Sequence, residues 1–291
     1  MKQKILFFSC CFILLILLIC GCTKEPDHIA ISSDGVKISF DMQGEGEPAL
    51  VFIHGWSNNR SIWDAQVSHF SERYKVVTID LPGFGESGNN RFNWTMASFG
   101  EDVATVIKKI NLEQVVLVGF SMGGPVVVEA ANKVPDRVTG VVLVDNMHDV
   151  EKMYPPPVIS YIDSVFMDLI THPTSEKLVG SGFYKKNPEA SFERVLSMLK
   201  DASRIGWRES LLDYLRWHNE DIATALQKCQ VPVMAINSDM EPTNVEAFRK
   251  LVPSYQAKIV PDVGHVIMWD APEEFNRLLE ENIQEFISKS K

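Results

Sequence analysis

One stretch of the chain, residues 115–124, limits the possible folds more than any other. It starts as an apolar, β-branched run of strand length, turns at Gly119-Phe120-Ser121-Met122-Gly123, and continues into an apolar segment at 126–131 that suits a buried helix. A serine hydroxyl is a weak nucleophile that must stand exposed beside a base. A tight strand-to-helix turn provides that exposure, and glycine relieves the crowding on either side of it. The stretch therefore predicts a strand, a sharp turn and a helix, with Ser121 as the nucleophile.

The net charge of the chain limits the kind of ligand that it can bind, and its size limits the core that it can bury. A net charge of −10 leaves the chain without the basic surface of a general nucleic-acid binder. We therefore expect a small-molecule substrate and no nucleic-acid partner. The 291 residues are 45% hydrophobic, which is enough to bury one large core.

Cysteine is unevenly distributed along the chain. Cys10, Cys11, Cys20 and Cys22 lie in or beside an N-terminal apolar run, so Cys229 is alone in the body. No disulfide framework can form within the body. Because Cys229 precedes an apolar strand, we expect it to be a small buried hydrophobe.

The N-terminus has the three parts of a secretory signal peptide. Residues 1–4 are basic, residues 5–20 are almost wholly apolar, and a small residue precedes Cys22 and a polar segment. The apolar run is shorter than the ~20 residues of a membrane-spanning helix. We therefore predict a cleaved signal peptide over 1–21 and a tether over 22–28. The alternative is an uncleaved membrane anchor.

The segment Ile19-Cys20-Gly21-Cys22 resembles the lipobox of bacterial lipoproteins. The resemblance implies cleavage before Cys22 and acylation of its thiol by lipid chains such as palmitate. Two or more acyl chains give stable anchoring where one does not. The body would then lie outside the cytoplasm, lipid-anchored in a bacterial cell envelope.

The body alternates between strand and helix patterns. Apolar runs typical of strands buried on both faces are separated by segments of helical spacing, an order that favours a parallel α/β sheet. We assign this core to residues 29–146 and 229–291. Its strands are expected at 29–31, 36–42, 49–53, 74–80, 115–118, 138–145, 231–236 and 257–260.

Residues 147–228 break this alternation. They contain no convincing strand and are rich in aromatic side chains, so we predict a helical cap inserted after the sixth core strand. An apolar, lidded pocket favours a small hydrophobic acyl or aryl group. The cap helices are expected at 158–170, 175–183, 189–202 and 207–218.

Four landmarks follow one another along the body: His54-Gly55-Trp56, the loop at 80–87, the turn around Ser121, and Gly264-His265. In these residues the chain resembles the α/β-hydrolases. The resemblance implies an eight-stranded, mostly parallel sheet flanked by helices. It also implies the activity of a serine esterase or of the cofactor-free haloperoxidase-like branch. No metal or cofactor is expected, since the sequence contains no ligand cluster.

The same resemblance gives roles to two side chains. Ser121 is the expected nucleophile. His265, which follows a late strand and precedes the last helix, is the expected general base, because an imidazole with a reference pKa of about 6.5 can take the serine proton and return it. His54 is the main rival, although in the family its ring shapes a loop. No motif surrounds His69, His148, His172 or His218.

Three residues are candidates for the acid that orients His265. The family pattern in the loop after the strand at 231–236 is Gly-x-x-Asp-Pro, and here the loop reads N-S-D-M-E-P. Counting back from its proline makes Glu241 the preferred candidate. Asp239 lies two residues earlier. Asp145 ends the preceding core strand, where some branches of the family keep their acid.

Two backbone N–H groups are expected to form an oxyanion hole: that of Met122, just after the nucleophile, and that of Trp56. Their side chains are then free to line the acyl pocket. Asp80 and the glycines at 83 and 85 look like a phosphate-binding loop. No Lys-Ser or Lys-Thr pair follows them, which excludes a P-loop. In the family this loop is structural.

These features together predict a carboxylic ester hydrolase that acts on a small hydrophobic substrate through an acyl-enzyme. Perhydrolase, lactonase and carbon–carbon hydrolase reactions use the same residues and remain alternatives. A further alternative is a non-catalytic binding lipoprotein that keeps the fold as a scaffold.

Overall fold

The computed structural model describes residues 28–172, 184–186, 188–199 and 203–289. The predicted signal peptide, Cys22 and the helix expected at 175–183 lie outside these ranges. Within them, no helix combines the length and the apolar character needed to cross a bilayer.

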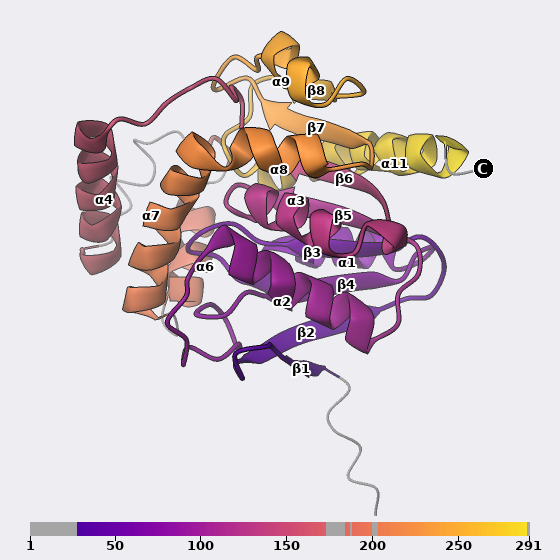
Figure 1. The fold of residues 1–291 in the computed structure, drawn as a ribbon, viewed down its shortest axis with the longest axis horizontal. Coiled ribbons are helices and arrows are strands. Elements are labelled where there is room, and N and C mark those ends of the chain that lie inside the picture. The colour runs from indigo at the N-terminus through magenta and orange to yellow at the C-terminus, as the bar shows by residue number, and fades with distance from the viewer. Residues whose placement is uncertain (1–27, 173–183, 187, 200–202, 290–291) are drawn as a thin grey trace, which may run out of the picture.

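Eight strands form one sheet in the order β1-β2-β4-β3-β5-β6-β7-β8 (Figure 1). The pairs β1–β2 and β2–β4 are antiparallel, and all the others are parallel. The predicted eight-stranded, mostly parallel sheet is therefore confirmed. The strands are β1 Ile29–Ile31, β2 Lys37–Gln43, β3 Ala49–Ile53, β4 Val76–Asp80, β5 Val115–Phe120, β6 Val138–Val144, β7 Val233–Ser238 and β8 Gln256–Val260.

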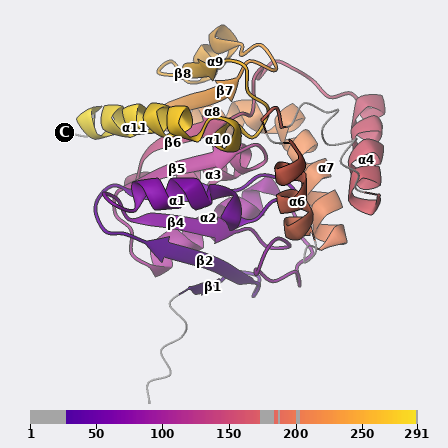
Figure 2. The ribbon, with the colours of Figure 1, turned by 180° about the vertical axis from the view of Figure 1, so that it is seen from behind.

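Alternate side chains of each central strand pack into two separate hydrophobic clusters, one on each face of the sheet. In β3, Val51 and Ile53 join one cluster, whereas Leu50 and Phe52 join the other. All of them are fully buried, as the continuous apolar run predicted. Figures 1 and 2 show the helices that cover the two faces. The first face carries α2 Met96–Lys109, α3 Gly123–Lys133, α8 Ile222–Lys228 and α9 Val245–Leu251, and the second carries α1 Asp64–Phe70, α10 Ile267–Asp270 and α11 Pro272–Lys289.

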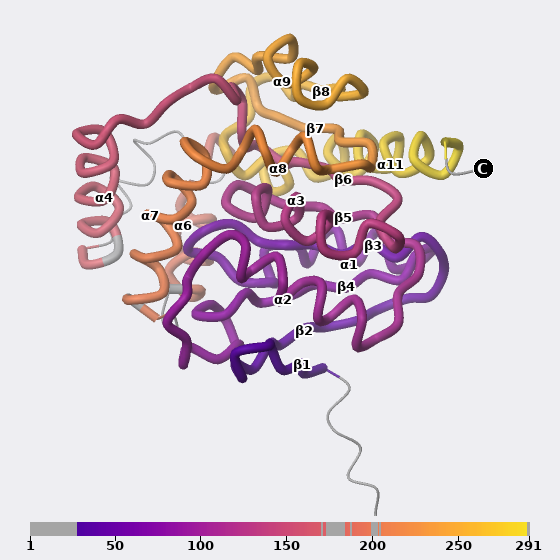
Figure 3. The backbone as a smooth tube through the Cα atoms, viewed as in Figure 1, coloured from indigo at the N-terminus to yellow at the C-terminus, as the bar shows by residue number. Residues whose placement is uncertain are grey.

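The segment between β6 and β7 leaves the sheet and returns, as the tube in Figure 3 makes clear. Its described helices are α4 Pro156–Thr171, α6 Pro188–Leu199, α7 Arg204–Glu220 and α8. The first three stand together at one end of the molecule, whereas α8 packs on α3 of the core. The helical insertion after the sixth strand thus has its predicted place. The boundaries of 147–228 as a separate cap remain a prediction.

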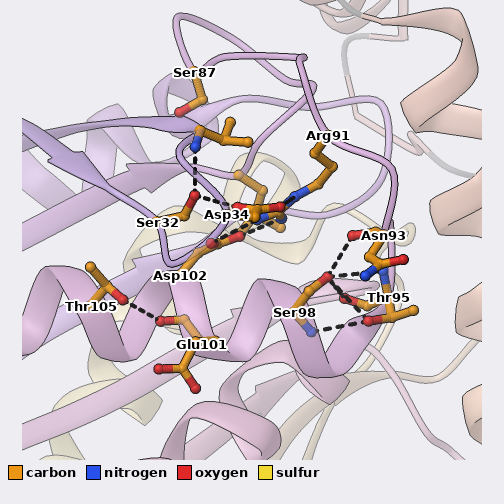
Figure 4. Close-up of polar contacts among 12 residues, drawn as sticks. Ser32, Asp34, Ser87, Arg91, Asn93, Thr95, Ser98, Glu101, Asp102 and Thr105 are labelled. Atoms are coloured by element: carbon orange, nitrogen blue, oxygen red, sulfur yellow. Dashed lines mark hydrogen bonds and ion pairs between the residues drawn. The ribbon is translucent and has the colours of Figure 1, made fainter.

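A buried arginine links α2 to the turn between β1 and β2 (Figure 4). The side chain of Arg91 is 2% exposed, and its Nη1 and Nη2 atoms donate to the carboxylate of Asp102 on α2 at 2.6 and 3.0 Å. Its Nε and Nη2 atoms also donate to Asp34, between β1 and β2, both at 3.0 Å. Arg91 holds the pKa of Asp34 at about 2. The forked guanidinium thus joins two carboxylates from separate segments.

Candidate active site

The turn that carries Ser121 has the geometry that its sequence predicts. β5 ends at Phe120, α3 begins at Gly123, and Ser121 between them has a φ of 51°. A Cβ atom at Gly119 would lie 2.3 Å from the carbonyl oxygen of Gly123, so a larger residue does not fit there. The strained, left-handed backbone at a serine is the sort of feature that persists where function requires it.

The loop after β3 lies directly against Ser121. A Cβ atom at Gly55 would come within 3.0 Å of the Cβ atom of Ser121. In the described part of the chain, no hydrogen bond connects the backbone N–H of Trp56 or Met122 to another protein group. Both groups therefore have their donors available beside the serine, as an oxyanion hole requires.

His54, the rival to His265, is a structural residue by its contacts. Its ring is fully buried; Nδ1 lies 2.7 Å from the carbonyl oxygen of Gly55, and Nε2 accepts the backbone N–H of Leu81 at 3.0 Å. Burial lowers the pKa of this imidazole, so the ring is neutral. Both nitrogens are occupied, and the ring joins the loop after β3 to the end of β4.

The acid beside His265 is Asp145. The Nδ1 atom of His265 lies 2.6 Å from Oδ2 of Asp145, and the backbone N–H of Ser238 donates to Oδ1 at 2.6 Å. The Asp145 side chain is 2% exposed. Burial disfavours its ionised form, but the contact with His148 and the hydrogen bonds with His265 and Ser238 outweigh that effect and hold the pKa of Asp145 well below its usual range. Asp145 is therefore an ionised carboxylate in place to orient an imidazole.

The preference for Glu241 as the partner of His265 is wrong. The Glu241 carboxylate is 56% exposed, and its Oε2 atom lies 3.1 Å from Nζ of Lys152. Asp239 also points elsewhere, with Oδ2 accepting the backbone N–H of Asp262 at 3.1 Å. The physical reason is that β7 was expected to end at residue 236 but continues to Ser238. This extension brings the Ser238 N–H to Asp145, whereas the side chains of Asp239 and Glu241 are exposed.

The candidate residues other than Asp239 line one cavity of about 410 Å³. Four of the six non-glycine residues with positive φ in the described ranges line it, and a functional site is where such strain is expected. Those four are Ser57, Ser121, Asp145 and Met147. The other lining residues include His265, Trp56, Phe166, Leu169, Val195 and Leu211.

The inserted helices also contact Trp56 at the wall of the cavity. Its indole Nε1 donates to the backbone oxygen of Trp207 on α7 at 2.7 Å. Its ring meets Phe166 of α4 edge-on, with 5.0 Å between centroids, and lies 5.5 Å from the ring of Trp207. The predicted place of the Trp56 side chain in the pocket wall therefore agrees with these contacts, and aromatic packing makes this wall apolar.

The loop at 80–87 uses its backbone N–H groups for hydrogen bonds within its own segment, so they are not aimed at a phosphate. Asp80 is buried and accepts the backbone N–H groups of Arg60 and Glu86 at 2.7 and 2.9 Å. A Cβ atom at Gly85 would collide with the Asp80 carboxylate at 2.3 Å. The Asp80 side chain thus holds its own loop in place, which agrees with a structural role for this loop. Within the described ranges, no group of three or more His, Cys, Asp or Glu side chains is arranged to hold a metal ion.

Residues 48–272 match the model of a family described as the alpha/beta hydrolase fold. The chain belongs to this family. The prediction that it is an enzyme of the hydrolase class is thereby confirmed, whereas its branch within the family remains a prediction.

Relatives of this α/β-hydrolase agree with the assignment. It is 24% identical over 255 residues to the pimeloyl-(acyl-carrier protein) methyl ester esterase of Yersinia enterocolitica, covering 84% of this chain and 96% of that protein. It is 33% identical over 111 residues to the dihydrolipoyllysine-residue acetyltransferase component of the acetoin cleaving system of Cupriavidus necator, but it spans only 30% of that protein's length. The solved structure of an esterase from Exiguobacterium antarcticum has a TM-score of 0.76 at 21% identity and covers 88% of this chain and 99% of that one.

Two contributors to the site had no motif to reveal them. The Ser238 N–H is a backbone group whose position depends on where β7 ends. His148 lies close to Asp145 because the chain turns back just after β6, where both Asp145 and Met147 have positive φ. The sequence signal that would have helped is the Asp-Asn-Met-His run directly after a buried strand, since Asp and Asn are the residues that most readily take a left-handed turn.

Proposed function

We propose that this α/β-hydrolase cleaves a carboxylic ester, or a related acyl bond, of a small hydrophobic substrate through an acyl-enzyme on Ser121. One observation carries the proposal. Ser121, on its positive-φ turn, and the His265–Asp145 pair, joined at 2.6 Å, open into the same apolar cavity. A nucleophile beside an oriented base is the arrangement that acyl transfer needs.

The proposed chemistry assigns one task to each group. Asp145 accepts the Nδ1–H of His265, which leaves Nε2 unprotonated and able to take the proton of Ser121. The serine Oγ attacks the carbonyl carbon, and the backbone N–H groups of Trp56 and Met122 stabilise the oxyanion. Each such donor contributes about 3 kcal/mol to the transition state. His265 then protonates the departing alcohol.

Water completes the reaction by the reverse assignment. His265 removes a proton from water, the hydroxide attacks the acyl carbon, and the proton passes to Oγ of Ser121 as the acid leaves. The walls made by Trp56, Phe166 and Leu169 suit an apolar acyl or aryl group. They supply little to hold a highly charged substrate near the nucleophile.

The test is hydrolysis of p-nitrophenyl esters from acetate to decanoate by the protein and by Ser121→Ala. We expect a burst of nitrophenol, stoichiometric with enzyme, that Ser121→Ala abolishes. The chain length that gives the highest kcat/KM reports the depth of the cavity. Labelling of Ser121 by a fluorophosphonate probe is the second readout. Absence of both turnover and labelling in folded protein would contradict the proposal and favour a binding scaffold.

We further propose that the protein is a lipoprotein, with residues 1–21 as a signal peptide and Cys22 as the acylated residue. The support is the sequence alone: a basic start, an apolar run and a small residue before the cysteine. This proposal is independent of the catalytic one and is tested separately.

A further inference from the structure

The acid beside His265 has a second imidazole for a neighbour. The Nε2 atom of His148 lies 3.5 Å from Oδ1 of Asp145, whereas His265 approaches Oδ2. One buried carboxylate thus faces a histidine at each of its oxygens. The side chain of His148 is 13% exposed and lines the same cavity as Ser121.

The contacts around His148 fit a ring whose N–H faces the carboxylate. The Nδ2 atom of Asn237 donates to Oγ1 of Thr243 at 3.0 Å, so the Thr243 hydroxyl has its own proton free to give. That hydroxyl lies 3.4 Å from Nδ1 of His148. If Nδ1 accepts, the neutral ring carries its proton on Nε2, the nitrogen that faces Asp145.

The backbone of His148 is held independently of its side-chain contacts. The N–H of Asn244 donates to the carbonyl oxygen of His148 at 2.7 Å, which joins the loop after β6 to the loop after β7. The end of β7 and the loop after it, where the sequence favoured an acid, therefore supply donors toward an acid that directly follows the neighbouring strand β6. Ser238 donates directly to Asp145, and Thr243 acts through His148.

We propose that His148 is a positioning residue that fixes the Asp145 carboxylate for His265, so that the working unit is Ser121, His265, Asp145 and His148. The inference rests on the proposed function and extends it. With Oδ1 held by Ser238 and His148, the carboxylate has little freedom to rotate, and Oδ2 stays aimed at Nδ1 of His265. A base held in one orientation reacts faster because the productive geometry is already formed.

His148 also acts on the charge that His265 feels. A donor at Oδ1 withdraws negative charge from the carboxylate, and the imidazolium form of His265 is then less stabilised than beside a free carboxylate. Removal of that donor leaves more negative charge on the Asp145 oxygen that faces His265. The acid limb of the kcat/KM profile, where the base is lost to protonation, should therefore move to higher pH. Other titratable groups that line the cavity are Asp149, Lys152, Tyr154, Tyr184, Tyr214, His218 and Glu241.

The experiment compares His148→Leu, which removes the donor, with His148→Gln, which offers an amide N–H at a similar place. For ester hydrolysis we expect His148→Leu to lower kcat about tenfold with KM within about twofold. Its acid limb should move up by a few tenths of a pH unit. His148→Gln should recover most of the rate, and Thr243→Val should give an intermediate loss. His69→Gln, an exposed histidine on α1, is the control for loss of one imidazole.

A double-mutant cycle separates positioning from general damage. If His148 acts through Asp145, adding His148→Leu to Asp145→Asn should cost little more activity. Equal losses in both backgrounds, or an unmoved acid limb in folded His148→Leu, would overturn the inference. The proton NMR signal of His265 Nδ1–H is a readout that needs no turnover, and it should shift in His148→Leu but not in His69→Gln. Failure of the proposed function would instead be seen as wild-type protein no more active than Ser121→Ala.

Discussion

At the scale of single residues, the acid at the end of β6 is the main departure from the pattern of the sequence. Asp145 is buried, accepts hydrogen bonds at both oxygens and takes a φ of 46°, whereas Glu241 pairs with Lys152 at the rim. A buried carboxylate with several donors stays ionised and immobile, which is what an orienting acid must do. An exposed glutamate in a surface ion pair does neither.

The two carboxylates should respond very differently to neutralisation. Asp145→Asn should lower kcat for ester hydrolysis roughly 10³-fold or more, because the amide no longer selects the right tautomer of His265. Glu241→Gln and Asp239→Asn should stay within about fivefold, since they break only exposed contacts. Steady-state kinetics of the three variants at one pH decide the matter. A collapse in Glu241→Gln with an active Asp145→Asn would reverse the assignment.

At the scale of elements, the position of β1 and β2 on α2 depends on one buried charge. Arg91 joins Asp34 and Asp102, and the Asp102 side chain is only 1% exposed. A buried pair is not in itself strong evidence for stability, but removing one partner leaves a buried charge without compensation. The contact between α2 and the edge of the sheet should therefore be weakened most by a substitution that removes only one of the two charged partners.

Arg91→Met should lower the free energy of unfolding by about 3 to 5 kcal/mol, because Asp102 would remain buried and unpaired. The double variant Arg91→Met/Asp102→Leu should recover much of this loss. Urea titrations of the three proteins, with the slopes compared, give the values. A loss below about 1 kcal/mol in Arg91→Met would show that water replaces the guanidinium at no great cost.

Much of the element order could be read from the sequence, and the failures have a physical cause. The fully buried strand Ala49–Ile53 and the turn around Ser121 carry local signals, a continuous apolar run and a glycine-flanked serine. The identity of the acid that orients His265 depends on which strand ends nearest to His265. The pairing of β6 with β7 decides this. Asp145 N–H donates to the carbonyl oxygen of Ile236, and β7 runs on to Ser238. Spacing along one chain segment carries no information on such a pairing.

At the scale of the entire fold, the described chain begins at the edge of the sheet. β1 lies at one edge of the sheet, and the helices α4, α6 and α7 stand at one end of the molecule (Figure 1). The tether between Cys22 and Ile29 can span at most about 25 Å when fully extended. A lipid-anchored body would therefore keep its β1 edge close to the membrane surface.

Replacement of the lipidated residue tests that arrangement. Cys22→Ser should fail to reach the mature electrophoretic mobility, because neither lipid attachment nor the following cleavage can proceed. Cys20→Ser, which alters the neighbouring thiol, is the matched control and should fractionate as the parent does. If Cys22→Ser still sediments with membranes at full strength as the mature form, the lipoprotein assignment fails.

The position of Asp145 and His148 at the foot of the insertion matters to anyone who exchanges caps between related hydrolases. A chimera joined after Met147 would replace His148 together with the cap, and a donor within 3.5 Å of the Asp145 carboxylate would be lost with it. A junction placed after Asp149 would retain it. The position of the junction thus decides what a cap exchange changes. A junction after Asp149 changes the cap alone, whereas a junction after Met147 also removes the proposed support of His148 for the Asp145–His265 pair.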